Sequence, residues 1–144
     1  MILSKEYILT LTCLKEIGVK GIGPKKIFAI GETIKDKNLH ISKLETLASL
    51  MAGMKEKAIN SVVLSDLEEA NVVAKKLIKA SEANQIGLVG YYDEEYPEIL
   101  RQTINEEGKL DPPLLLWYKG DLSIAQMPGI AVIGTREVTP EGIV

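Results

Sequence analysis

The sequence predicts a mainly α protein in which a helical part is followed by the beginning of an α/β sheet. Apolar residues recur at spacings of three and four over roughly the first eighty positions, as on the buried face of a helix. Short β-branched and aromatic runs follow over 86–92, 114–118 and 130–134. The last run meets Gly134 and then Pro140, a strand, turn and helix start with which parallel α/β sheets begin.

A glycine-rich turn separates the first two predicted helices. Ser4 is an N-cap residue, so the first helix is expected to begin there, with the apolar positions Ile8, Leu11, Leu14 and Ile17. Gly18 and Gly21 end this helix. The second helix begins at Pro24 and buries Ile27, Phe28 and Ile30.

Two capping boxes, each a Ser with Glu three residues later, predict where two further helices begin. Ser42 opens a helix that ends at Gly53 and buries Leu44, Leu47, Leu50 and Met51, and a short helix with Ala58, Ile59 and Val62 follows. Ser65 opens the longest helix, about residues 66–84. Its apolar stripe is Leu67, Ala70, Val73, Ala74, Leu77 and Ile78, with Lys75, Lys76 and Lys79 facing outward.

Extended and irregular structure is expected after residue 85. The strands 86–92 and 114–118 are separated by a short helix that begins at Tyr96 and Pro97, with Ile99, Leu100 and Ile104 on one side. A few residues around 122–125 are expected to coil before the last strand. The acidic run Asp93, Glu94 and Glu95 is interpreted as a solvated turn.

The composition excludes several classes of site. The chain has 144 residues, 46% hydrophobic and 26% charged, without the run of roughly 20 apolar residues that a membrane span needs. The single Cys13 excludes an internal disulfide and fits the reducing cytoplasm. With one His and one Cys, a zinc site is not expected, and no candidate nucleophile accompanies His40.

The charge is divided unevenly along the chain. Residues 1–80 hold thirteen Lys and Arg against nine Asp and Glu, a net +4, whereas residues 81–144 hold four against eleven, a net −7. The asymmetry suggests two modules with different roles. The basic half is either an electrostatic footprint for nucleic acid or a solvated face rich in lysine.

The segment Gly21-Ile22-Gly23, placed between two helices, has the pattern of a helix-hairpin-helix DNA-binding turn. Its glycines permit close approach of a phosphate, and the free N–H groups of the second helix face that phosphate. Lys25 and Lys26 lie in the first turn of the same helix and would contact the backbone without reading bases. The alternative is a turn that only reverses the chain.

The turn Gly134-Thr135-Arg136 is the second candidate anion site. Gly134 permits close approach, the Thr135 hydroxyl can donate, and the Arg136 guanidinium matches phosphate geometry. The alternative is that Gly134 ends a core strand while Arg136 pairs with Glu137 or Glu141.

Four motifs come in one order in the second half of the chain: YPEIL from Tyr96, DPPLLLWYKG from Asp111, IAVIGTR from Ile130 and TPEG from Thr139. Together they resemble the start of the DNA-processing protein A (DprA/Smf) family, closely over about residues 86–144. The helical part is similar, more loosely, to the helix-hairpin-helix-like or SAM-like domain that precedes the Rossmann-like core in that family.

The resemblance implies a helix-hairpin-helix/SAM-like domain over 1–84 and the first strands and helix of a Rossmann-like DNA-binding domain over 85–144. It implies a cytoplasmic protein that binds single-stranded DNA in natural transformation and assists loading of the RecA recombinase, without catalytic activity, metal or cofactor. In the family, the arginine of the glycine turn holds the DNA backbone, a role that maps onto Arg136 with support from Gly134 and Thr135.

Two departures from the family bear on these expectations. Glu141 stands where the family often has an aromatic residue. Most of the Rossmann-like core, with its other basic contacts and its dimerisation surface, does not follow, so we expect a truncated fragment whose DNA binding by itself is left open. Its strands cannot all be covered within one copy, which predicts pairing between chains in a homo-oligomer or disorder over 130–144.

Two rival functions remain open. The helical part could be an interaction module for a protein partner or for self-association, because its core pattern is strong and its charge modest. Alternatively, the Rossmann-like part could belong to an enzyme acting on a nucleotide or phosphosugar. The aromatic residues Tyr91, Tyr92, Trp117 and Tyr118 are interpreted as packing residues, with base stacking as the alternative.

Overall fold

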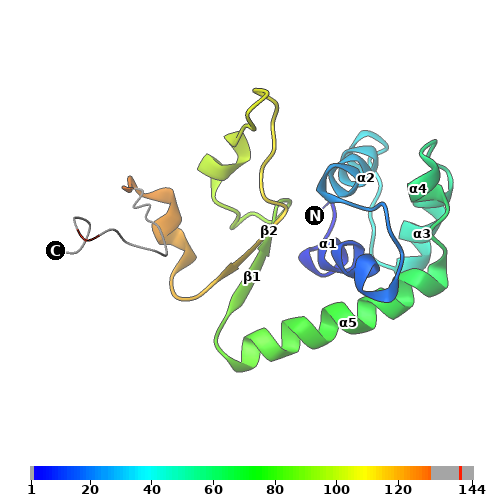
Figure 1. The fold of residues 1–144 in the computed structure, drawn as a ribbon, viewed down its shortest axis with the longest axis horizontal. Helices are drawn as coiled ribbons and strands as arrows, with labels where there is room; N and C mark the ends of the chain where they lie inside the picture. The colour runs from blue at the N-terminus through cyan, green and yellow to red at the C-terminus, as the bar shows by residue number, and fades with distance from the viewer. Residues whose placement is uncertain (1, 131–139, 141–144) are drawn as a thin grey trace.

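The computed structural model describes residues 2–130 and 140, and it is mainly helical with one small sheet (Figure 1). The helical part comprises α1 (Lys5–Thr12), the 3₁₀ helix η1 (Cys13–Ile17), α2 (Pro24–Asp36), α3 (Leu44–Ala52), α4 (Lys57–Asn60) and α5 (Leu64–Ala83). It is followed by β1 (Gly87–Gly90), η2 (Glu98–Gln102), β2 (Leu115–Tyr118) and η3 (Leu122–Gln126). The predicted order of a helical part followed by short strands is confirmed.

The ends of the first two helices agree with the sequence prediction. The Ser4 hydroxyl accepts a hydrogen bond from the Tyr7 N–H at 3.2 Å and so caps α1. The helix tightens into η1 and ends at Gly18, which has a φ of +86°. Helix α2 begins at Pro24 and buries Ile27, Ile30, Gly31 and Ile34, while Phe28 is only half-buried.

Both predicted capping boxes are wrong. The N-cap of α3 is Lys43, without a capping side chain, and the Ser42 carbonyl instead accepts a hydrogen bond from the distant Tyr7 hydroxyl at 3.2 Å. Helix α5 begins one residue before Ser65, because the Asp66 carboxylate reaches back to the Val63 N–H at 3.1 Å. The start of α5 is thus capped by Asp66 rather than by a serine hydroxyl, and the start of α3 has no side-chain cap.

The core lies where α1 and η1 pack on α5, with α2 and α3 closing the sides. Its fully buried side chains are mostly Leu and Ile: Ile8, Leu11, Leu14, Ile30, Ile34, Leu47, Ile59 and Leu67. Asn71 of α5 is also buried, and its amide donates to the Thr10 hydroxyl at 3.0 Å and the Glu6 carboxylate at 3.2 Å. This polar contact satisfies the amide and fixes α5 against α1.

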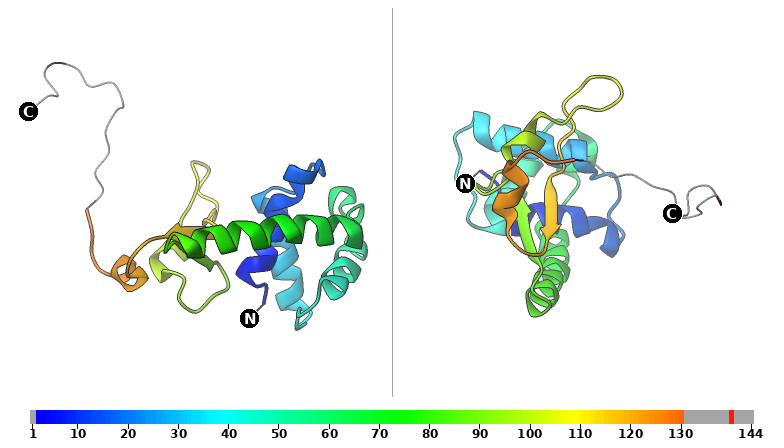
Figure 2. Two further views of the ribbon diagram at one scale, coloured as in Figure 1. Left: turned by 90° about the horizontal axis from the view of Figure 1, so that it is seen from below. Right: turned by 90° about the vertical axis from the view of Figure 1, so that its left-hand side faces the viewer.

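Helix α5 is long enough to underlie both the helical cluster and the sheet (Figures 1 and 2). The predicted apolar stripe is correct for Leu67, Ala70 and Ala74 but wrong for Leu77, which is 45% exposed. The C-terminal part of α5 extends beyond the helical cluster towards β1 (Figure 1). This part of the helix therefore has fewer neighbours to bury its side chains. Lys75, Lys76 and Lys79 are exposed, as predicted.

Strands β1 and β2 pair antiparallel, with Leu88 opposite Trp117 and Val89 opposite Leu116. The sheet packs on the helices: Leu88 belongs to the main core, and a Cβ added at Gly90 would lie 3.2 Å from the Lys5 Cα of α1. The parallel sheet start predicted for 130–144 lies outside the described residues, apart from Ile130 and Pro140.

The segment between the strands is less buried than the sequence predicts. Residues 98–102 do form a short helix, but Ile99 is 69% exposed and Ile104 is 61% exposed, so only Leu100 of the predicted apolar side is partly buried. Ile104 and Leu110 form an isolated antiparallel bridge, and the Leu110 side chain is exposed as well. Residues 122–126 form η3, close to the coil predicted there.

Candidate nucleic-acid interface

The turn between η1 and α2 is the part of the predicted interface that the structure describes. Gly18 and Gly21 have φ angles of +86° and +94°, a left-handed backbone that favours glycine. A Cβ added at Gly21 would also lie only 3.3 Å from the Ala58 Cβ of α4. The left-handed backbone explains Gly18, and the left-handed backbone together with the close approach to α4 explains Gly21. A DNA-binding hairpin and a turn that only reverses the chain would both need these two glycines.

Gly23 leaves the start of α2 open. It is the N-cap in an extended conformation, and a Cβ added there would meet no atom within 4 Å. Its carbonyl accepts from the N–H groups of Lys26 and Ile27, each at 3.1 Å. Within residues 2–130 and 140, the N–H groups of Gly23 and Lys25 make no hydrogen bond. They and the positive end of the helix dipole are thus available to an anion.

The two predicted lysines differ in their surroundings. Lys25 is exposed. The Lys26 ammonium lies 3.9 Å from the Glu56 carboxylate, with the two side chains 34% and 57% exposed. An ion pair at this exposure contributes about 0–1 kcal/mol, so a phosphate can compete for the ammonium. Both cations are in the first turn of α2, where the helix dipole opposes them until an anion binds.

The four predicted hairpin residues Gly21, Gly23, Lys25 and Lys26 line one recess of about 410 Å³. Pro24 and Asp111 complete its lining. The structure therefore brings the predicted hairpin residues together. Asp111 comes from the segment that precedes β2, and the sequence did not suggest that it would lie here. Its carboxylate opposes a phosphate in the recess, so the lysines determine whether the site attracts an anion.

The second predicted site, Gly134, Thr135 and Arg136, lies outside the described residues. The structure therefore neither joins these residues to the hairpin nor separates them from it.

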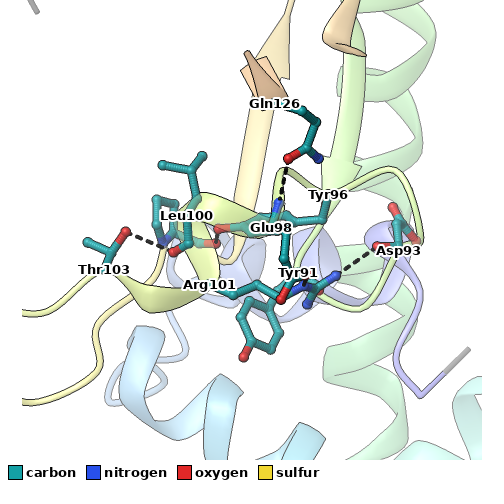
Figure 3. A network of polar contacts seen from close by, with 9 residues as sticks. Tyr91, Asp93, Tyr96, Glu98, Leu100, Arg101, Thr103 and Gln126 are labelled. Atoms are coloured by element: carbon teal, nitrogen blue, oxygen red, sulfur yellow. Dashed lines mark hydrogen bonds and ion pairs between the residues drawn. The ribbon is translucent and has the colours of Figure 1, made fainter. Parts of the chain in front are cut away.

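A cluster around Arg101 was missed by the sequence analysis (Figure 3). The guanidinium lies 4.9 Å from the ring centroids of both Tyr91 and Tyr96. It donates to the Tyr91 carbonyl, to the Asp93 carbonyl at 3.0 Å and to the Glu98 carboxylate at 2.8 Å. Because the guanidinium already makes these hydrogen bonds, Arg101 stabilises the turn after β1 and is not a free cation for a ligand.

The prediction that Asp93 lies in a solvated turn is wrong. Asp93 is 4% exposed, and its carboxylate accepts from the Gly90 N–H at 2.7 Å. This hydrogen bond closes the turn after β1. The hydrogen bond from Arg101 to the Asp93 carbonyl stabilises the same turn. Glu94 and Glu95 are exposed, as predicted. Nothing in the spacing of the acidic run distinguished the buried carboxylate from its neighbours.

Packing explains the tyrosines that follow β1. Tyr91 makes edge contacts with Phe28, Tyr92 and Tyr96 at centroid distances of 5.5, 5.0 and 5.5 Å. The Tyr96 hydroxyl donates to the Pro113 carbonyl at 2.6 Å, and burial raises the pKa of this hydroxyl to about 12 although the Arg101 cation opposes the rise. Trp117 differs from these residues, since it is 44% exposed.

Residues 87–144 match the family model described as DNA recombination-mediator protein A. The match confirms the family that the ordered motifs predict. No curated protein and no solved structure matches the chain. The recombination-mediator segment, as we call residues 87–144, begins with β1 and contains the Arg101 cluster, Asp111, Trp117 and the predicted Gly134–Arg136 turn. The match supports a role in DNA recombination or processing.

Three further observations concern metal ions, the cysteine and membrane spans in residues 2–130 and 140. These residues contain no cluster of three His, Cys, Asp or Glu side chains suited to a metal ion. Cys13 is buried, and burial raises the pKa of its thiol, so little of the nucleophilic thiolate forms near neutral pH. None of the helices in this part of the chain is both long and apolar enough to cross a membrane.

Proposed function

We propose that this protein binds single-stranded DNA and assists loading of the RecA recombinase onto it. The match of residues 87–144 to the recombination-mediator family carries this proposal. In the proposed arrangement, Arg136 contacts the DNA backbone with support from Gly134 and Thr135, and the mediator segment is the beginning of a Rossmann-like domain. The protein acts by holding DNA rather than by catalysing a reaction.

The hairpin adds a second contact to the DNA backbone in this proposal. Gly23, Lys25 and Lys26 line one recess. In the described part of the chain the N–H groups of Gly23 and Lys25 make no hydrogen bond, Lys25 is exposed and Lys26 is only weakly paired. Such contacts fix the path of a strand without selecting its sequence. The helical domain over 1–84 would then be of the helix-hairpin-helix type and would extend the DNA path from the mediator segment.

Fluorescence anisotropy of a labelled single-stranded oligonucleotide, titrated with the full chain, tests the proposal. We expect saturable binding that weakens as salt rises, because bound cations release counterions from the DNA. Arg136→Ala should weaken binding several-fold, whereas Lys119→Ala, which removes an exposed cation of the same segment, should have a smaller effect. Equal affinities for Arg136→Ala and the unchanged protein would remove the site assignment.

A second assay tests the link to the recombinase. RecA hydrolyses ATP when it assembles on single-stranded DNA, so its hydrolysis rate on DNA coated with a single-strand-binding protein reports loading. We expect the full chain to shorten the lag before hydrolysis and Arg136→Ala to restore most of it. A lag that the full chain leaves unchanged would contradict the loading role while leaving DNA binding intact.

A protein partner is the second candidate for the helical part. The observation in its favour is that Asp111 and Glu56 place carboxylates beside the hairpin cations. If the hairpin binds a protein instead of DNA, hairpin variants should leave the salt dependence of oligonucleotide binding unchanged.

A further inference from the structure

A cavity of about 490 Å³ lies between the hairpin and the segment that leads into β2. Most of its lining is apolar and includes Leu9, Ile22, Ile27, Pro112, Leu114 and Leu115. The groups that differ from this lining are Trp117, Lys15, Thr12 and Asp111. The cavity shares Gly23, Pro24 and Asp111 with the recess that holds Lys25 and Lys26.

Trp117 is the large aromatic group of this cavity. Residues two apart on a strand point to the same face, so Trp117 shares a face of β2 with Leu115, which packs against the helical core. Trp117 is nevertheless 44% exposed, and among residues 2–130 and 140 it makes no aromatic pair. The indole therefore lines a cavity instead of filling the core.

The chemistry of this lining suits a nucleobase joined to a phosphate. A half-exposed indole beside aliphatic side chains offers a flat apolar surface on which any base can stack. Lys15 supplies an exposed cation for the phosphate. The Thr12 hydroxyl already donates to the Ile8 carbonyl at 2.9 Å, so it offers the cavity only an acceptor. Asp111 lines both the cavity and the recess at the start of α2 and repels a phosphate in either place, so the phosphate of this unit is expected at Lys15.

We propose that this cavity holds one nucleotide unit of single-stranded DNA, with its base against Trp117 and its phosphate at Lys15. The inference rests on the proposed DNA-binding function. It adds the place in the structure where a base of the bound strand is buried. The neighbouring phosphate would then reach the recess with Lys25 and Lys26, since the cavity and the recess adjoin at Gly23. We assign a continuous strand as the occupant, because a strand reaches both places at once, whereas a nucleoside monophosphate has a single phosphate.

The chain has one tryptophan, so its emission reports directly on the proposed contact. We would titrate the full chain with a thymidine oligonucleotide while recording tryptophan emission and its quenching by acrylamide, with anisotropy of the same labelled oligonucleotide in parallel. We expect emission to fall and acrylamide quenching to weaken along the same binding curve as the anisotropy.

Variants separate the stacking contact from folding defects. Trp117→Ala should weaken binding at least about fivefold, whereas Trp117→Phe retains an aromatic face and should recover most of the affinity. Lys15→Ala should weaken binding more than Lys76→Ala, an exposed lysine of α5 that does not line the cavity. Circular dichroism of each variant confirms the helical fold before titration.

Three outcomes would overturn the inference, and they differ in what they leave standing. If the labelled oligonucleotide binds while tryptophan emission, acrylamide quenching and the Lys15→Ala affinity stay unchanged, the cavity assignment fails and the proposed function survives. If no oligonucleotide binds, the proposed function fails together with the inference. If thymidine monophosphate binds as tightly as the oligonucleotide, the cavity is a free-nucleotide site and the strand assignment is wrong.

Discussion

The Tyr92 hydroxyl donates a hydrogen bond of 3.0 Å to the Glu32 carboxylate, which joins the turn after β1 to helix α2. The contact depends on a glycine, because a Cβ added at the buried Gly31 would lie 2.2 Å from the Tyr92 hydroxyl oxygen and 2.6 Å from two ring carbons. The recombination-mediator segment is thus joined to the helical part through side chains that are sixty positions apart.

We predict that Gly31→Ala destabilises the protein although alanine favours helices. Overpacking costs about 1–3 kcal/mol and the gain in helix propensity returns about 1 kcal/mol, so a net loss should appear in urea unfolding. The control is Gly53→Ala, where the added Cβ would lie 3.6 Å from the Leu50 carbonyl oxygen, an ordinary contact distance. In a Tyr92→Ala background the Gly31→Ala cost should disappear, and an unchanged cost there would contradict the assigned clash.

We predict that Arg101→Ala lowers the free energy of unfolding by about 1.5–3 kcal/mol, because hydrogen bonds from the guanidinium to Tyr91, Asp93 and Glu98 are lost. Arg101→Lys should recover little of the loss, since an ammonium cannot reproduce the planar fork between two tyrosine rings. The measurement is the urea midpoint.

Lys109→Ala is the matched control for this loss. The Lys109 ammonium pairs with Glu107 at 3.0 Å, but both side chains are about 70% exposed. Its removal should change stability by less than about 1 kcal/mol. A loss as large as that of Arg101→Ala would show that the cluster has no special role.

Stability should fall at alkaline pH. The Tyr96 hydroxyl has a pKa near 10.0 in the unfolded chain and about 12 in the folded protein, because burial disfavours the phenolate. Below pH 10.0 its contribution is complete, and it is lost as pH rises towards about 12, since only the unfolded state then releases the proton easily. Burial also raises the pKa of Tyr92, which adds to the loss in the same direction.

Urea midpoints measured across this pH range check the prediction. Tyr96→Phe should flatten the alkaline fall, whereas Leu88→Ala, which removes a buried aliphatic group from β1, should lower stability while keeping the fall as steep as in the unchanged protein. An equally steep fall in Tyr96→Phe would exclude this hydroxyl as its source.

We predict that Lys25→Ala reduces the salt dependence of oligonucleotide binding. Each phosphate contact contributes about one unit to the slope of log affinity against log salt, so the slope should become shallower by about one. Lys76→Ala on the exposed face of α5 should leave the slope close to that of the unchanged protein. Identical slopes in both variants would exclude the hairpin as a DNA contact and favour its role as a protein-binding or chain-reversing turn.

Local sequence signals predicted the family match of residues 87–144 and several helix ends. Ser4, Gly18 and Pro24 act through caps and backbone geometry within one helical turn, so the sequence alone predicts them. The ordered motifs of the mediator segment likewise depend only on residue identity and spacing. The same local rules failed at Ser42, where α3 begins without a side-chain cap, and at Ser65, where Asp66 caps the helix one turn from its start instead.

Tertiary structure decided which side chains are buried and which form sites. Asp93 and Glu94 are neighbours of similar chemistry, yet only Asp93 is buried, because Gly90 and Arg101 lie on its side of the turn. Asp111 and Trp117 meet Gly23 and Lys15 only because the segment before β2 folds back against the hairpin. Burial depends on the faces that distant elements present to each other, and the order of residues along the chain does not determine those faces.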